Sequence, residues 1–263
     1  MTTTIALAGK GGTGKTTVSA MIIKYLINKG KGPILAIDAD PSANLNMVLG
    51  VDLENTIGGI REGMLQQVQN SQNVGGAARG SMAGGMSKHD YLDYEIHSSL
   101  IESDKFDLIA MGRSEGPGCY CAVNHNLRDI LDRLSHNYPY VVMDNEAGME
   151  HLSRRTTQDV DYLFIISGPT QRGLAAAAGI VELKDELEIR IKNTYFILNR
   201  VPGEIPAPLQ ERIDNLDVPF LGPVPADDNV MEYDFSGKPL LELEDDSPVY
   251  QSVAAMMDKV LGL

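Results

Sequence analysis

The chain of 263 residues carries 22 Lys or Arg against 36 Asp or Glu, a formal net charge of −14, and 43% of it is hydrophobic. The hydrophobic content suffices for the core of one large α/β domain, residues 1–263. The charge disfavours nucleic acid and anionic membranes as partners, because no general electrostatic attraction would support binding. The apolar stretches are strand-sized and the first begins within four residues, so we expect no transmembrane helix, no signal peptide and a cytoplasmic location.

Strand-sized apolar runs alternate with helical periodicity nearly from end to end. This order predicts an α/β fold: a mostly parallel central sheet of seven or eight strands with helices on both faces. The predicted strands are residues 5–8, 33–38, 106–111, 140–144, 162–166, 194–198 and 219–221, and the predicted helices are residues 18–26, 126–134, 173–187, 207–215 and 248–263. Residues 71–88 are rich in Gly and Met without a period, which favours a flexible loop, either inert or ordered by a partner.

The sequence GKGGTGKTT occupies positions 9–17, between the first predicted strand and the first predicted helix. A strand, G-x-x-x-x-G-K-T and a helix are together the context of a phosphate-binding P-loop. Glycines let backbone N–H groups turn toward phosphates, and the helix N-terminus adds partial positive charge. We expect Lys15 to reach the β- and γ-phosphates and Thr16 to bind Mg²⁺. The sequence therefore predicts a nucleoside triphosphate site with Lys15 as a catalytic residue, lined by Gly11, Gly12, Thr13, Gly14, Lys15, Thr16 and Thr17.

Lys10 adds a second cation to this loop. A lone lysine at such a place is ordinarily a solvated surface residue. Because Lys15 already occupies its own phosphates, Lys10 is free to serve the nucleotide of a neighbouring subunit. With this lysine the loop resembles the deviant Walker A motif of the MinD/ParA/nitrogenase-iron-protein class. The resemblance implies a homodimer formed face to face around two nucleotides, in which Lys10 contacts phosphate across the interface and takes part in catalysis.

Three aspartates end predicted strands, at the edge where ligands bind in open α/β sheets. Asp38 and Asp40 end the second strand and Asp144 ends the fourth. Carboxylates there can hold Mg²⁺ through water, a role we predict for Asp38 and Asp144. Asp40 lies farther out, where it can orient the attacking water, and the resemblance implies the same role. The alternative is that Asp38 and Asp40 only cap the turn before Pro41.

The base is predicted to be adenine, and the nucleotide therefore ATP. The guanine-reading sequence N-K-x-D is absent after the strand at 194–198, which is followed by Asn199 and Arg200. Asn199 can hydrogen-bond adenine, as the matching Asn does in the resembled class. Pro225 and its neighbours would form the other wall of the pocket. We therefore add Asn199, Arg200 and Pro225 to the predicted ATP-binding residues.

The two cysteines, Cys119 and Cys121, stand one residue apart. Three interpretations are open: small residues in a loop, a strained redox pair, or half of a tetrahedral metal site that a twofold-related subunit completes. Lys10 independently predicts such a dimer, which favours the metal site. His125 follows four residues later and is expected on a helix surface, because a lone histidine carries no ligand pattern.

The P-loop, the C-x-C pair and the segment DNEAGMEH at 144–151 together resemble the CooC family of nickel-insertion accessory ATPases of carbon monoxide dehydrogenase, and the related AcsF family of acetyl-CoA synthase. The resemblance covers residues 5–261. It implies a homodimeric ATPase that binds Ni²⁺ or Zn²⁺ between subunits through Cys119 and Cys121 and passes nickel to carbon monoxide dehydrogenase. Within the segment, Gly148 is a candidate hinge and Glu150 a candidate contact with the partner subunit.

Two other classes of P-loop protein were weighed. A nitrogenase-like Fe–S electron-transfer protein would need a cysteine after the Walker B strand, and residues 144–155 contain none. A partitioning or positioning ATPase that assembles on DNA or membranes conflicts with the net charge of −14. It also conflicts with the C-terminal segment 248–263, whose only cation is Lys259. The ATP-dependent metallochaperone is the preferred prediction, and acetyl-CoA synthase maturation is its nearest alternative.

Overall fold

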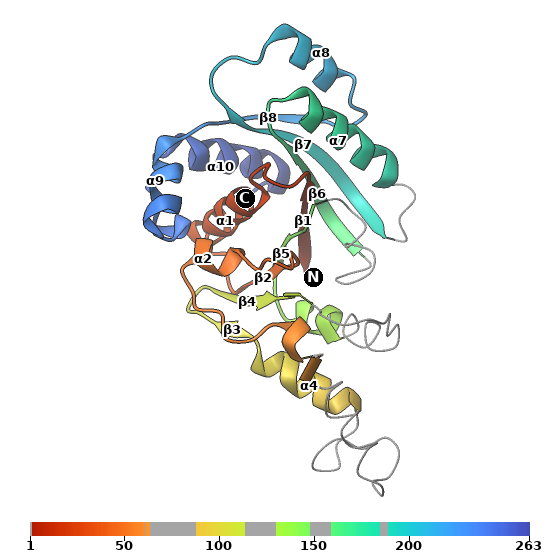
Figure 1. Ribbon diagram of the computed structural model, residues 1–263, viewed down its shortest axis with the longest axis vertical. Coiled ribbons are helices and arrows are strands. Elements are labelled where there is room, and N and C mark those ends of the chain that lie inside the picture. Colours follow the sequence, from red (N-terminus) through yellow and green to blue (C-terminus); the bar gives the residue numbers. More distant parts are fainter. Residues whose placement is uncertain (1, 61, 64–87, 114–129, 148–158, 185–188) are drawn as a thin grey trace, which may run out of the picture.

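A computed structural model describes residues 2–60, 62–63, 88–113, 130–147, 159–184 and 189–263 (Figure 1). Its elements in chain order are β1 (Thr3–Gly9), α1 (Lys15–Asn28), β2 (Ile34–Asp38), α2 (Leu45–Leu49), α4 (Lys88–Ser98), β3 (Ile101–Glu102), β4 (Phe106–Ala110), β5 (Tyr140–Asp144), β6 (Asp159–Ser167), α7 (Gln171–Leu183), β7 (Arg190–Val201), α8 (Ala207–Asp214), β8 (Phe220–Pro225), α9 (Asp228–Ser236), the 3₁₀ turn η3 (Leu240–Glu242) and α10 (Pro248–Leu261).

The eight strands of the described residues form one sheet in the order β3-β4-β2-β5-β1-β6-β7-β8. Every pairing is parallel except that of β3 with β4. The predicted α/β fold with a mostly parallel sheet is therefore confirmed. The strand that carries the P-loop, β1, lies between β5 and β6 and is flanked by strands on both sides.

Side chains of successive strand residues point into two separate cores. Ile5 and Leu7 of β1 pack with α1 and α10, whereas Ala6 and Ala8 belong to the core on the opposite face. This alternation follows from the period of two in an extended strand. Figure 1 shows α1 and α10 together on one side of the sheet and α7 on the other. Burial on both faces explains why the strands read as continuous apolar runs.

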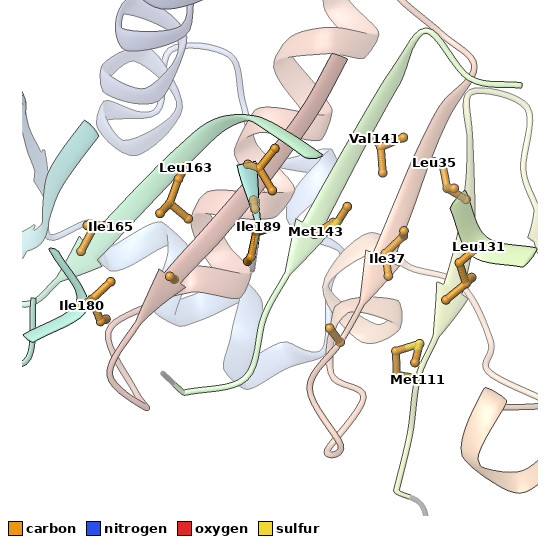
Figure 2. Close-up of a cluster of buried hydrophobic side chains, with 14 of the residues drawn as sticks. Leu35, Ile37, Met111, Leu131, Val141, Met143, Leu163, Ile165, Ile180 and Ile189 are labelled. Carbon is orange, nitrogen blue, oxygen red and sulfur yellow. The ribbon is translucent and has the colours of Figure 1, made fainter. Parts of the chain in front are cut away.

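The core on the α7 face draws side chains from the whole width of the sheet (Figure 2). The figure shows β2, β5 and β6 each contributing a pair of side chains two residues apart, namely Leu35 and Ile37, Val141 and Met143, and Leu163 and Ile165. Ile180 of α7 lies beside Ile165 in the figure and belongs to the same core. Truncating one such fully buried side chain to alanine costs about 2–5 kcal/mol, so this layer holds the carboxyl edge of the sheet in place.

The structure adds elements that the sequence pattern did not predict. The two-residue β3 and the five-residue α2 are too short to show a period, and α9 buries none of its residues. The predicted helix 173–187 is observed as α7, with its last residues outside the described part. Residues 130–134 of the predicted helix 126–134 are helical. The predicted flexible loop 71–88 lies outside the described residues up to position 87. No helix in the described ranges is both long and apolar enough to cross a membrane.

Candidate nucleotide-binding site

The P-loop leaves β1 at Gly9 and enters α1 directly after Gly14. Both glycines have positive φ, 156° and 85°. A Cβ on Gly9 would lie 2.2 Å from the carbonyl oxygen of Ile166, and one on Gly14 would lie 2.3 Å from Nδ2 of Asn199. Glycine is therefore required at both positions by backbone conformation and by close approach of neighbouring strands.

Hydrogen bonds within the loop hold it in a compact turn. The Thr13 hydroxyl donates to the carbonyl oxygen of Lys10 at 2.8 Å. The Lys15 ammonium donates to the carbonyl oxygens of Gly9 and Lys10 at 3.3 and 3.5 Å. Burial lowers the pKa of Lys15, opposed by carboxylates of which Asp144 acts most strongly. Within the described residues, the printed hydrogen bonds of this buried cation go to carbonyl oxygens, a setting that favours a bound anion such as the phosphates predicted here. The Lys10 side chain is exposed.

Asp38 and Asp144 lie side by side at the carboxyl edge of the sheet. The β2–β5 register pairs them directly, and the β1–β5 register pairs Asp144 with Leu7. Burial raises the pKa of Asp144 to about 7 and that of Asp38 to about 6.

Asp144 has a buried carboxylate oxygen without a hydrogen-bond partner among the described residues. Asp144 accepts a hydrogen bond from Thr16, while its Oδ1 has no partner among the described residues. An orphaned carboxylate oxygen next to a hydroxyl fits Mg²⁺, because the cation offsets the cost of burying the charge.

The carboxylate of Asp38 is already engaged by the loop that follows β2. Its Oδ1 accepts from the backbone N–H of Asp40 at 3.0 Å, and its Oδ2 accepts from that of Leu45 at 2.8 Å. Asp40 in turn accepts from the backbone N–H of Ser42 at 2.8 Å. These bonds match the alternative in which both aspartates cap the turn. The Mg²⁺ role of Asp38 and the catalytic role of Asp40 stay predictions.

Asn199 and Arg200, the two predicted ATP-binding residues of β7, contact the backbone of the P-loop. Asn199 is buried, and its Nδ2 donates to the carbonyl oxygen of Thr13 at 2.8 Å. Arg200 donates from Nη1 to the carbonyl oxygen of Gly12 at 3.1 Å and has a positive φ of 59°. Pro225 ends β8 beside them. The sequence did not predict these hydrogen bonds to the loop, and the ATP-binding role of the three residues stays a prediction.

Asn145 was missed as a functional candidate. It directly follows Asp144, is 1% exposed, and donates from Nδ2 to the carbonyl oxygen of Leu7 at 2.8 Å. The available signal was a polar residue immediately beyond a strand-ending aspartate at the ligand-binding edge.

The predicted thiolate site falls outside the described residues. This holds for Cys119, Cys121 and His125, and also for Gly148 and Glu150 of the segment after β5. Among the residues that the structure does describe, no three His, Cys, Asp or Glu side chains cluster as metal ligands would. The metal-binding role of the cysteines therefore stays a prediction.

A P-loop on a parallel sheet, with a buried lysine and a strand-ending aspartate beside it, defines the class of P-loop nucleoside triphosphatases. Residues 4–240 match the family model of the CobQ/CobB/MinD/ParA nucleotide-binding domain, CbiA. The chain belongs to this family and is a P-loop ATPase.

Relatives extend over nearly the whole chain. An uncharacterized ATP-binding protein of Methanocaldococcus jannaschii is 42% identical over 262 residues, 98% of both chains. The carbon monoxide dehydrogenase accessory protein CooC of Rhodospirillum rubrum is 29% identical over 269 aligned positions, 97% of both chains. Among solved structures, the septum site-determining protein MinD of Pyrococcus horikoshii, complexed with Mg-ADP, superposes with a TM-score of 0.66 at 22% identity, covering 99% of this chain and 96% of that one. This last likeness concerns the fold.

Proposed function

We propose that this ATPase is a homodimeric, ATP-dependent metallochaperone that carries Ni²⁺, or Zn²⁺ in its place, and delivers nickel to carbon monoxide dehydrogenase. The observation that carries the proposal is the 29% identity to CooC over 97% of both chains, in a sequence that also has Cys119-x-Cys121. The Methanocaldococcus relative, although more similar, is uncharacterized and favours no particular cargo.

ATP binds with its phosphates in the P-loop. Lys15 turns from the carbonyls of Gly9 and Lys10 to the β- and γ-phosphates, while Thr16 and Asp144 hold Mg²⁺. Mg²⁺ neutralises charge that develops on the phosphates. The Mg-ADP in the Pyrococcus MinD structure supports this choice of ligands.

Hydrolysis requires a second subunit in this proposal. Lys10, whose side chain is exposed on the loop, contacts the phosphates of the partner's nucleotide. Asp40 orients the attacking water. ATP binding thereby draws two copies together, and hydrolysis releases them, which couples nucleotide state to whatever the interface holds.

The cargo is held by four thiolates, two from each copy. A twofold axis beside Cys119 and Cys121 presents the same pair twice and completes a tetrahedral set. Thiols must lose protons to bind the metal ion, so metal affinity falls at low pH. Thiolate ligation suits several divalent ions, and geometry selects among them.

Equilibrium dialysis against Ni²⁺ tests the cargo. The parent dimer should retain about one metal ion, as a shared four-thiolate site requires, and the Cys119→Ala/Cys121→Ala variant should retain none. His97→Ala/His136→Ala is the matched control, because it removes two exposed imidazoles and leaves the thiols. Parent-like retention by the cysteine variant would contradict the proposal.

The recipient is tested by nickel transfer to purified apo-enzymes. Nickel-loaded protein with MgATP should activate nickel-free carbon monoxide dehydrogenase more than nickel-free acetyl-CoA synthase. The opposite preference would assign it to acetyl-CoA synthase maturation. Activation of neither enzyme above the level given by free Ni²⁺ would contradict delivery.

A further inference from the structure

The side-chain carbonyl of Asn145 is buried near the P-loop and has no hydrogen-bond donor among the described residues. Asn145 is 1% exposed. Its Nδ2 faces two carbonyl oxygens, those of Leu7 at 2.8 Å and Met143 at 3.4 Å. Because both are acceptors, the NH₂ group must occupy that side and Oδ1 must point away from it. Oδ1 accepts no hydrogen bond within the part of the chain that the structure describes.

Such an orphaned acceptor is costly, about 1–3 kcal/mol for a buried polar group. An isolated core asparagine would satisfy both ends of its amide. Asn145 satisfies only the donor end, and it does so at the carboxyl edge where ligands of this fold bind. The unsatisfied end indicates a group that arrives with the nucleotide.

The two described residues after Asn145, Glu146 and Ala147, lie close to the P-loop. The Cβ of Ala147 lies 3.8 Å from where a Cβ on Gly11 would be. The carboxylate of Glu146 acts on Lys15, raising the pKa that burial lowers. Because Lys15 is the residue that reaches the β- and γ-phosphates, these two observations bring the segment that begins at Asn145 close to the phosphate side of the P-loop.

Few groups in a loaded site can donate to this oxygen. Phosphate oxygens of ATP are acceptors only, and Mg²⁺ offers no proton except through its water. Lys15 would be drawn to the phosphates. We take water as the donor, because the place next to the γ-phosphate is where the nucleophilic water must stand.

We propose that Asn145 is a catalytic residue whose Oδ1 accepts a hydrogen bond from the water that attacks the γ-phosphate. The water oxygen forms the new bond to the γ-phosphorus, and the bond from that phosphorus to the β–γ bridging oxygen breaks. ADP and inorganic phosphate result, one water proton remaining on the phosphate and the other passing to solvent. Asn145 stays neutral throughout. The proposal rests on the ATPase activity and is independent of any metal cargo.

Steady-state kinetics at saturating Mg²⁺ test the role. Asn145→Ala should lower kcat about 100-fold, because a misplaced nucleophile costs that much, and should leave KM for ATP and the affinity for ADP within about threefold of the parent values. Asn46→Ala is the matched control. Its amide also donates from Nδ2 to a carbonyl, that of Val51 at 3.2 Å, and also leaves Oδ1 unpaired, but on α2. The control should hydrolyse ATP at the parent rate.

Three outcomes would overturn the proposal. Equal losses of kcat and ADP affinity would assign Asn145 to loop structure. Recovery of the rate at high Mg²⁺ would assign its oxygen to a metal-bound water. A parent-like kcat would leave it without a role in hydrolysis.

The parent protein supplies a test that does not depend on a variant folding. A high-resolution structure with ADP, Mg²⁺ and aluminium fluoride should show a water that is an axial ligand of the aluminium and lies within hydrogen-bond distance of Asn145 Oδ1. Oδ1 bonded instead to Lys15, or to no water, would overturn the proposal.

Discussion

The side-chain amide of Asn199 donates a hydrogen bond to the backbone carbonyl of Thr13 at 2.8 Å, across 186 positions of the sequence. The bond joins β7, the strand that precedes the predicted base pocket, to the loop that holds the phosphates. Both groups are buried, so the bond is shielded from water and braces the loop before nucleotide arrives.

Replacing Asn199 by alanine should therefore weaken nucleotide binding. The Thr13 carbonyl would lose its buried donor, at a cost of about 1–2 kcal/mol, which lowers ADP affinity about tenfold. Titration with a fluorescent ADP analogue measures this. Asn193→Ala is the control. Asn193 lies on β7 like Asn199, and its side-chain amide donates a similar but exposed hydrogen bond to the carbonyl oxygen of Asp161 on β6. Equal affinities of the parent and the Asn199 variant would refute the bracing role.

A comparison of Gly14 with Gly12 distinguishes the cost of an unfavourable backbone conformation from the cost of a steric contact. Both have positive φ, 85° and 78°, which costs an alanine about 1–2 kcal/mol. Only at Gly14 would the new Cβ meet a neighbour, Nδ2 of Asn199 at 2.3 Å. Gly14→Ala should thus destabilise the protein by about 1–3 kcal/mol more than Gly12→Ala. Urea denaturation of the two variants compares them, and identical midpoints would contradict the contact.

The buried Asp144 makes the nucleotide-free protein less stable as pH rises. Its pKa is raised to about 7, so between pH 4 and 7 the native state binds a proton that the unfolded state releases. The protonated carboxyl stabilises the native state fully below the pKa of the unfolded state. This contribution to the free energy of unfolding is lost as the pH rises to the native pKa, and the loss is at most about 4 kcal/mol. Asp144→Asn should flatten this dependence and be more stable than the parent at pH 8, while losing Mg²⁺-dependent hydrolysis.

Thermal denaturation from pH 4 to 8, with EDTA and without nucleotide, measures the effect. Adding Mg²⁺ and ADP should stabilise the parent at pH 8 and leave Asp144→Asn nearly unchanged, because the variant lacks the carboxylate. A parent whose stability rises steadily over this range would show that other groups dominate.

Asp40 is predicted to act on the water and not on binding. Asp40→Ala should reduce kcat about 100-fold with little change in ATP affinity, because general-base or water-orienting groups contribute about that much. The exposed Asp52→Ala serves as the surface control. If Asp40→Ala hydrolyses ATP at the parent rate, the carboxylate merely holds the Ser42 turn that the structure shows.

Lys10 is predicted to be needed for ATP-dependent dimerisation and not for nucleotide binding by the monomer. Its side chain is exposed, so Lys10→Ala should leave ADP binding to the monomer unchanged and abolish ATP-dependent dimerisation, measured by sedimentation velocity with a slowly hydrolysed analogue. Lys105→Ala is the control, because Lys105 is exposed just before β4, at the opposite edge of the sheet. Dimerisation of the Lys10 variant at parent concentrations would remove the evidence for a cross-subunit lysine.

Much of the fold could be predicted because its signals are local. Strands buried on both faces read as apolar runs, and the P-loop, with Gly14 and Lys15, is contiguous in sequence. Elements without such signals were missed. β3 has two residues and α9 buries none of its own, so neither leaves a periodic pattern.

The sequence by itself determined the class of the site, because a complete P-loop between a strand and a helix indicates that a nucleoside triphosphate binds there. It also located Asp38 and Asp144 at one edge. The tertiary structure decided how those groups are used. It engages both oxygens of Asp38 in a turn, and it gives one oxygen of Asp144 no partner in the part of the chain that is described.

Residues remote from the loop acquired their roles only through the sheet. Strand order and register bring Asn199 to Thr13 and Asn145 to Leu7, pairs separated by 186 and 138 positions. No local sequence pattern predicts these long-range contacts, because the register of the strands depends on how both hydrophobic cores pack against the sheet.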